Sequence, residues 1–305
     1  MEKLKKGFIF LSTVGLAATL SACNDNKDTK EDKSENKTET KSENKSTDSK
    51  TATSNDKEDN KVENDSKEVD VNQLTEKTKL ALAFFADDVD QYILTKDEAL
   101  TGVFETNYGG KKEKKQLYKL LLIKTNNVAN APKGMNFYQV YPAKGSFASV
   151  IGVSKDKVFV GGTQGAFDYK QMQDTSKEYN IKDLYNQNKS YSSLSELAKK
   201  IQITDKNPME DDKTREKFEA NENPGTNTHM RTQVYTMIEE LDGQPIDTDK
   251  YLVDNVQMDD NGKWYVHYRN KNAEIVGTYT TKDGKVVKKD ADGNIIKEKK
   301  VNPNN

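Results

Sequence analysis

The sequence of 305 residues contains one cysteine, Cys23, and two histidines, His229 and His267. A single cysteine excludes an internal disulfide, so the fold has to be stable on its apolar core alone. It also excludes a structural zinc site of the cysteine and histidine type, because such a site needs more of these ligands than the chain has. We therefore expect neither a bound metal nor another cofactor.

Apolar residues are scarce as well. The chain is 33% hydrophobic and 32% charged, whereas globular domains are roughly half apolar. The deficit is concentrated in residues 24–70, which contain no aromatic residue, leucine, isoleucine, glycine or proline. Such a segment cannot bury enough apolar surface to offset its conformational entropy. We expect a disordered tether rather than a solvated single helix, since its many Asn, Ser, Thr and Asp residues compete for backbone hydrogen bonds.

The net charge of −2 is unevenly distributed. Residues 1–6 carry +2, and residues 24–70 carry −5 from ten lysines and fifteen acidic residues. The remainder is then close to +1. A folded part so near neutrality shows no overall electrostatic footprint for nucleic acid.

The chain has no apolar run long enough to cross a membrane. The apolar stretch from Gly7 to Leu20 is shorter than the roughly 20 residues that a spanning helix needs. A basic start, a short apolar core and small residues at its end are typical of a signal peptide. That end reads Leu20-Ser21-Ala22-Cys23.

This ending resembles the lipobox of bacterial lipoproteins at all four positions, and the resemblance covers the first 23 residues. It implies a diacylglycerol on Cys23, cleavage before that residue and an extracytoplasmic location at the cell membrane. The Lys, Asn, Asp and Ser spacer that follows also resembles that of surface lipoproteins of low-GC Gram-positive bacteria. The alternative is an ordinary secretory signal that leaves Cys23 as a free thiol.

Beyond the tether, the pattern predicts an α+β fold with antiparallel sheets and packed helices, divided into two small modules. The predicted organisation is a signal peptide at 1–22, the lipidated cysteine and tether at 23–71, an α+β module at 72–203, a linker at 204–228, and a smaller helix-plus-β-meander module at 229–305.

Apolar periodicity predicts the elements of both modules. Helices are expected at 73–92, 194–201 and 230–241. Strands are expected at 100–106, 116–124, 137–141, 147–153, 157–160, 251–258, 263–269 and 274–280, with a last hairpin at 282–299. Ser193 and Glu196 have the spacing of a capping box, and Asp260-Asn261-Gly262 predicts a hairpin turn.

One strip of side chains is a candidate binding surface. Alternation along the strand at 263–269 places Tyr265, His267 and Arg269 on one face, which we expect to point outward. Aromatic and guanidinium planes stack on sugars and peptides. A structural role for His267 is the competing interpretation, because a catalytic histidine needs a partner in contact.

Three further motifs have simpler explanations. Residues 161–165 (GGTQG) follow a strand, as a phosphate loop does, but no Lys-Ser or Lys-Thr pair comes after them. Residues 290–294 contain oxygen ligands but lack the glutamate that ends a calcium loop, so a hairpin turn is favoured. Asp87, Asp88 and Asp90 form an acidic patch that we interpret as a solvated surface.

No catalytic motif is found, so the sequence favours a non-enzymatic binding module for a cell-wall or envelope-protein ligand. One alternative is an envelope hydrolase that uses a pair of carboxylates. The other is the solute-binding component of a transporter, which predicts two lobes with parallel sheets around a cleft.

Overall fold

The computed structural model describes residues 70–301. Cys23 and nearly all of the tether predicted at 23–71 lie outside the described residues. The described part belongs to one compact unit. Its helices and predominantly antiparallel sheets confirm the predicted α+β class.

The larger half of this unit is built on a six-stranded sheet in the order β7-β6-β5-β4-β3-β8. Neighbouring strands are antiparallel except β3 and β8, which are parallel. The strands are β3 (Leu121–Thr125), β4 (Asn136–Tyr141), β5 (Ala148–Val153), β6 (Lys157–Thr163), β7 (Ser176–Asn180) and β8 (Gln202–Thr204). The sequence predicted β4 from its alternation of aromatic and polar residues, and β5 and β6 from their β-rich composition. Their apolar residues are buried on both faces of the sheet.

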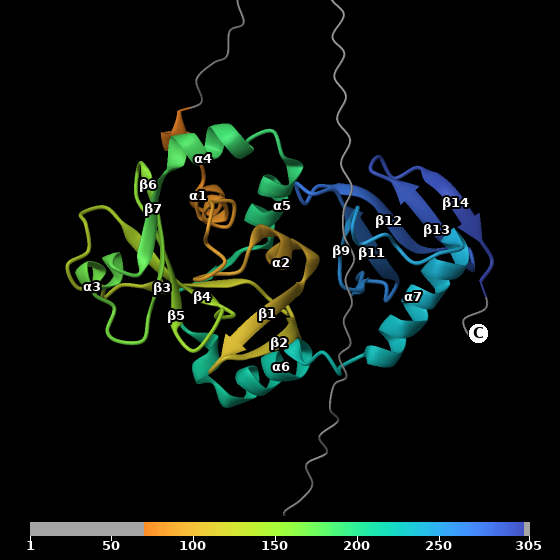
Figure 1. Ribbon diagram of the computed structural model, residues 1–305, viewed down its shortest axis with the longest axis horizontal. Coiled ribbons are helices and arrows are strands. Elements are labelled where there is room, and N and C mark those ends of the chain that lie inside the picture. The colour runs from red at the N-terminus through yellow and green to blue at the C-terminus, as the bar shows by residue number, and fades with distance from the viewer. Residues whose placement is uncertain (1–69, 302–305) are drawn as a thin grey trace, which may run out of the picture. The chain divides into compact units, whose positions relative to one another are not determined.

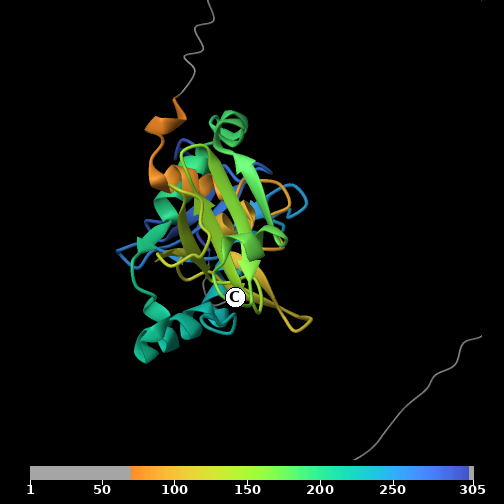
Figure 2. The same ribbon diagram turned by 90° about the vertical axis from the view of Figure 1, so that its left-hand side faces the viewer.

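Helices cover both faces of this sheet. Figure 1 shows α1 (Glu76–Ala83), α4 (Ile181–Asn188) and α5 (Ser192–Lys200) on one side and α3 (Tyr169–Gln173) on the other. Residues such as Val140 and Ile151 face the first group, while Phe137 and Phe159 pack with Met172 of α3. Figure 2 looks onto this sheet from the α3 side, with its green strands running side by side.

A hairpin and a short helix precede the sheet. The hairpin consists of β1 (Val103–Tyr108) and β2 (Lys111–Gln116), and helix α2 (Lys96–Thr101) lies just before it. The strand predicted at 100–106 therefore starts late. Thr95 and Glu98 form a capping box that begins α2, and Gly102 ends it with a φ of 77°. The exposed run of lysines after Gly110 forms β2, a strand that the sequence pattern did not predict.

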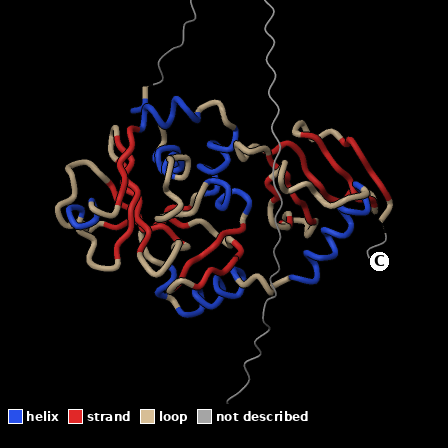
Figure 3. The backbone as a smooth tube through the Cα atoms, in the orientation of Figure 1, coloured by secondary structure: helices blue, strands red, loops and turns tan. Residues whose placement is uncertain are grey.

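The smaller half contains helix α7 (Thr228–Asp242) and a second six-stranded sheet. Its strands are β9 (Leu252–Val253), β10 (Gln257–Met258), β11 (Trp264–Arg269), β12 (Ile275–Lys282), β13 (Lys285–Asp290) and β14 (Ile295–Lys299). The predicted turn at Gly262 and the helix end at Gly243 are both confirmed. Figure 3 shows α2 and α5 in blue between the two six-stranded sheets.

Two predictions about the chain's course differ from the structure. The helix expected at 73–92 ends at Ala83, and turns that include Asp88 at a φ of 54° follow it. The segment 204–228, predicted as a linker, contains helix α6 (Asp212–Glu222). Phe218 of α6 is buried against Tyr118 and Tyr141 in edge-to-face contacts. Phe218 is the only large apolar residue of α6, and one such residue is too weak a signal to predict a docked helix.

Candidate functional site

Tyr265, His267 and Arg269, the strip predicted on β11, lie on one face of the strand as expected, but they are less exposed to solvent than expected. Val266 and Tyr268 point into the core beneath α7, as alternation along the strand predicted. Tyr265 and His267 lie on the opposite face and are half-buried. Arg269 on that same face is only 1% exposed, so it is not an outward-facing surface group. The strip is covered here because α5 packs over its end.

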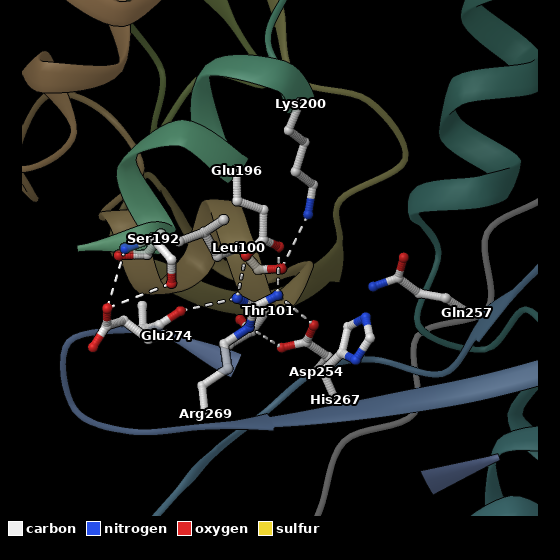
Figure 4. Close-up of polar contacts among 12 residues, drawn as sticks. Leu100, Thr101, Ser192, Glu196, Lys200, Asp254, Gln257, His267, Arg269 and Glu274 are labelled. Atoms are coloured by element: carbon white, nitrogen blue, oxygen red, sulfur yellow. Dashed lines mark hydrogen bonds and ion pairs between the residues drawn. The ribbon is translucent and has the colours of Figure 1, made fainter. Parts of the chain in front are cut away.

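Arg269 is held by two carboxylates and a carbonyl (Figure 4). Its Nε and Nη2 donate to Asp254 at 2.6 and 2.8 Å, and its Nη1 and Nη2 donate to Glu196 of α5 at 2.8 Å each. Nη1 also donates to the carbonyl of Ala273 at 2.9 Å. These five bonds match the five N–H donors of a guanidinium, and the flanking carboxylates hold the pKa of Arg269 above its ordinary value. No donor remains for a ligand.

Lys200 and His267, close to Arg269, are also engaged by neighbouring groups. Burial lowers the pKa of Lys200, whose Nζ donates to the carbonyl of Leu100 at 3.0 Å. Burial also lowers the pKa of His267, whose Nδ1 lies 2.8 Å from Thr278 Oγ1. The predicted capping box at Ser193 and Glu196 is absent, because Glu196 binds Arg269 instead. This cluster fastens α5 to β11 and lines none of the cavities described below.

The best candidate for a ligand site is a groove formed by two adjoining cavities. The smaller cavity has a volume of about 410 Å³ and the larger about 590 Å³, and both are lined by Gln91 and Phe147. The other lining residues of the smaller cavity are Tyr92, Gly162, Thr163, Gln164, Gly165, Gln171 and Thr175. Those of the larger cavity are Asp90, Glu98, Glu105, Asn107, Gly109, Gly110, Lys112, Lys144, Gly145 and Ser146. We call the two together the Phe147 groove.

Glycines make room for the ring at the centre of the groove. A Cβ atom at Gly162 would lie 2.6 Å from Cδ2 of Phe147, and one at Gly145 would lie 3.1 Å from its Cε1. A contact of 2.6 Å is shorter than real Cβ atoms make, so a larger residue at Gly162 would displace the ring, whereas the contact at Gly145 is tight but would require only a small shift. The GGTQG motif at 161–165 is therefore part of the groove wall. The motif forms the end of β6 and the loop after it, in agreement with the simpler interpretation. Glycine is needed at Gly162 because a side chain there would collide with Phe147.

Charges in the larger cavity are mostly paired. Lys144 Nζ contacts both carboxylate oxygens of Glu98 at 2.6 Å, and Lys112 lies 2.9 Å from Glu105. The Lys112 partner lowers the pKa of Glu105, and Glu105 in turn raises the pKa of Lys112. Asp90 has no ion-pair partner among residues 70–301, so the larger cavity carries one uncompensated negative charge.

The acidic patch predicted at the end of the first helix is dispersed in the structure. Asp88 pairs with Lys177 at 2.7 Å, and the carbonyl of Asp87 accepts a hydrogen bond from Tyr179 at 2.5 Å. Asp90 alone lines the groove. A carboxylate hydrolase needs a general acid whose pKa is raised. The pKa of Glu105 is shifted in the opposite direction, so Glu105 does not have this property.

The carboxyl group with a raised pKa lies elsewhere, at the end of α6. Glu222 is 5% exposed, and burial raises its pKa to about 7. Its Oε2 accepts a hydrogen bond from Tyr141 at 3.2 Å, whereas its Oε1 is buried without a partner. Glu222 lines neither cavity of the Phe147 groove. No sequence pattern singles out Glu222, since one glutamate in a charged helix is expected to be solvated.

The remaining motif forms a turn. Asp290 accepts hydrogen bonds from the backbone and side chain of Asn294, at 2.8 and 3.2 Å, within the β13–β14 hairpin. Across residues 70–301, no three His, Cys, Asp or Glu side chains are grouped so that they could hold a metal ion. In the same range, no helix is both long and apolar enough to span a bilayer.

The position predicted for lipidation, Cys23, cannot be related to this geometry because it lies outside the described residues. Compared with models of known families, with curated proteins and with solved structures, the chain matches none.

Proposed function

We propose that the chain is a lipid-anchored, extracytoplasmic binding protein without catalytic activity. A diacylglycerol on Cys23 holds it at the cell membrane, residues 24–71 form a spacer, and the folded part binds a ligand of the cell envelope in the Phe147 groove. The four residues Leu20 to Cys23 support the anchor, and the groove supports the binding role.

The observation that carries the binding role is the composition of the groove. Ligand sites combine apolar or aromatic surface with a few polar groups that fix orientation. Here a partly exposed ring, Phe147, separates a cavity lined by amides and hydroxyls from one lined by paired charges. Two of its lysines and two of its carboxylates already neutralise each other, which leaves them less available as acids, bases or nucleophiles.

The observations support the two alternatives, an envelope hydrolase and the solute-binding component of a transporter, less well. A hydrolase would need a second carboxylate free to act near Asp90, and both Glu98 and Glu105 are engaged by lysines. A transporter's solute-binding component would have two lobes of parallel sheet around the ligand. Strands of both six-stranded sheets are antiparallel apart from β3 and β8, and the groove lies on one side of the first sheet, among loops.

Sedimentation with washed cell envelopes tests the binding role. Residues 65–305 form their own compact unit, so the chain without its first 23 residues serves as the soluble probe. We expect it to sediment with the envelopes, and the double variant Gln164→Ala with Gln171→Ala to sediment less. Gln187→Ala on α4 is the matched control, because Gln187 is exposed and lines no cavity described above. Equal sedimentation of all three proteins would rule out the groove as the binding site.

A further inference from the structure

We infer that the Phe147 groove binds an uncharged oligosaccharide, with one sugar unit in the smaller cavity against the ring of Phe147. This inference rests on the proposed function, since it names the ligand class of that same groove. The argument uses the charge of the smaller cavity, its unused hydrogen-bonding groups and the pairing of the strands around it.

The smaller cavity has no ionised side chain in its wall. Its polar groups are three glutamines, two threonines, the phenol of Tyr92 and backbone, and the only other side chain is Phe147. A ligand with a net charge would lose its hydration here without gaining a counter-charge. Amides and hydroxyls both donate and accept hydrogen bonds, which matches the mixed donor and acceptor pattern of a sugar ring.

Several hydrogen-bonding atoms of these side chains have no partner among residues 70–301. Gln171 makes no side-chain hydrogen bond among the described residues. Gln91 and Gln164 use only their amide nitrogens, which donate to the carbonyls of Asp88 and Ser146 at 3.2 and 3.4 Å. Their carbonyl oxygens remain available to accept from ligand hydroxyls. The partly exposed ring of Phe147 supplies an apolar surface for the C–H face of a sugar.

An extended peptide fits the groove less well. Peptides in grooves commonly add a strand to a free sheet edge, but β6 is paired on both edges, with β5 and β7. On β1, the N–H groups of Glu105 and Asn107 already donate to Glu98 and to the carbonyl of Lys144, at 3.0 and 3.1 Å. β6 therefore has no free edge as far as Gly161, where its pairing with β7 ends, and these two N–H groups of β1 are already engaged. Among residues 70–301, the outer edge of β2 is the unpaired strand edge in the groove wall.

The charges in the larger cavity determine whether the groove prefers a neutral or an anionic oligosaccharide. Its lysines are paired with Glu98 and Glu105, and Asp90 adds one unpaired negative charge. An anionic chain that extends from the smaller cavity would meet Asp90 and be repelled. A neutral chain would not, so the groove should discriminate against uronic acid polymers in favour of neutral ones.

Calorimetric titration of residues 24–305 tests the inference with defined probes. The neutral probes are cellotetraose, maltotetraose and the tetramer of N-acetylglucosamine, and the comparison probes are tetragalacturonate and tetra-alanine. We expect at least one neutral tetrasaccharide to bind, and Gln171→Ala to weaken it about 3- to 10-fold, the usual effect of losing one hydrogen bond. Gln187→Ala should bind as the unmodified chain does, and Asp90→Asn should selectively improve binding of tetragalacturonate.

Three results would overturn the inference. The first is no binding of any neutral tetrasaccharide at about 10 mM, a concentration that fills even a weak site. The second is binding that Gln171→Ala leaves unchanged, which places the sugar outside the groove. The third is binding of tetra-alanine or tetragalacturonate in preference to the neutral probes. If envelope sedimentation still depends on Gln164 and Gln171 in any of these cases, the ligand class is wrong and the binding role stands.

Discussion

Arg269 and Asp254 form a two-bond ion pair in which neither side chain is more than 1% exposed. Asp254 lies between β9 and β10, and Arg269 ends β11, so the pair lies within the smaller half of the folded unit. Glu196 extends the pair to α5 of the larger half. The two halves are thus joined by a charge cluster that is buried at Arg269 and Asp254 and 35% exposed at Glu196, as well as by apolar contact.

Removing the guanidinium should destabilise the fold strongly. Arg269→Met leaves the buried carboxylate of Asp254 without its partner, and breaking a buried pair in this way costs about 3–5 kcal/mol. Urea unfolding of residues 24–305 at pH 7 measures the effect. The matched control is Lys285→Met at the exposed pair with Glu298, which we expect to cost less than about 1 kcal/mol. Equal effects of the two substitutions would contradict a special role of the buried pair.

Alternation along β11 predicted the facing of these residues but not their burial. A period of two assigns Tyr265, His267 and Arg269 to one face whatever covers that face. The covering helix α5 lies about 70 residues earlier in the sequence, as the Arg269–Glu196 pair shows. A contact between residues so far apart in the chain leaves no local pattern in the sequence. Sequence analysis therefore predicted an exposed strip.

Short sequence motifs predicted correctly the turns and helix ends whose backbone conformation depends on one or two residues. The Gly262 turn and the αL cap at Gly243 follow from backbone conformations that glycine adopts readily. Prediction failed at β2, because a run of lysines shows no apolar alternation. That strand is paired only with β1 and is mostly exposed, so charged residues suit it.

The Phe147 groove could not be predicted from the sequence, because residues far apart in the chain form it. Its wall is assembled from the loop that holds Gln91, the loop that holds Phe147 and the GGTQG segment. Of these three segments, only GGTQG forms a recognisable sequence motif, and a simple loop was its favoured interpretation over a phosphate loop. The glycines there serve the packing of an aromatic ring, which a single sequence does not show.

The buried carboxyl group of Glu222, whose Oε1 has no hydrogen-bond partner, leads to a prediction of how stability varies with pH. Its pKa is about 7 in the folded chain against an ordinary 4.5, so the folded state binds the proton more tightly than the unfolded state. Stability should therefore fall as pH rises from about 4.5 to about 7, by roughly 3 kcal/mol for a shift of this size. The neighbouring Tyr141, Lys115 and Glu219 are the other groups that act on this carboxyl.

Glu222→Gln removes the titration while keeping the side chain's size. We expect this variant to be more stable than the unmodified chain at pH 8, and to lose the decline in stability between pH 4.5 and 7. Urea unfolding at several pH values provides the comparison. Glu216→Gln is the control, because Glu216 is exposed on the same helix and is not among the groups that act on the Glu222 carboxyl, so it should leave the pH profile unchanged. Parallel profiles for both variants and the unmodified chain would show that Glu222 is not the group responsible.

The proposed anchor makes its own prediction about where the protein is found. Two acyl chains on Cys23 would bind the membrane firmly, since each buried CH₂ contributes about 0.8 kcal/mol. The rest of the chain offers little electrostatic attraction, because residues 24–70 carry −5 and residues 71–305 about +1. Cys23→Ala should therefore leave the protein unprocessed or release it from the cells, as fractionation and gel mobility of the full chain would show.

A salt wash separates a lipid anchor from charge attraction. About 1 M salt shortens the Debye length to roughly 3 Å, so it strips proteins held by charge and leaves lipid-anchored ones in the membrane fraction. We expect the unmodified chain and the tether control Thr51→Ala to resist the wash. A Cys23→Ala protein that is correctly processed and still resists it would show that another part of the chain holds the protein to the membrane.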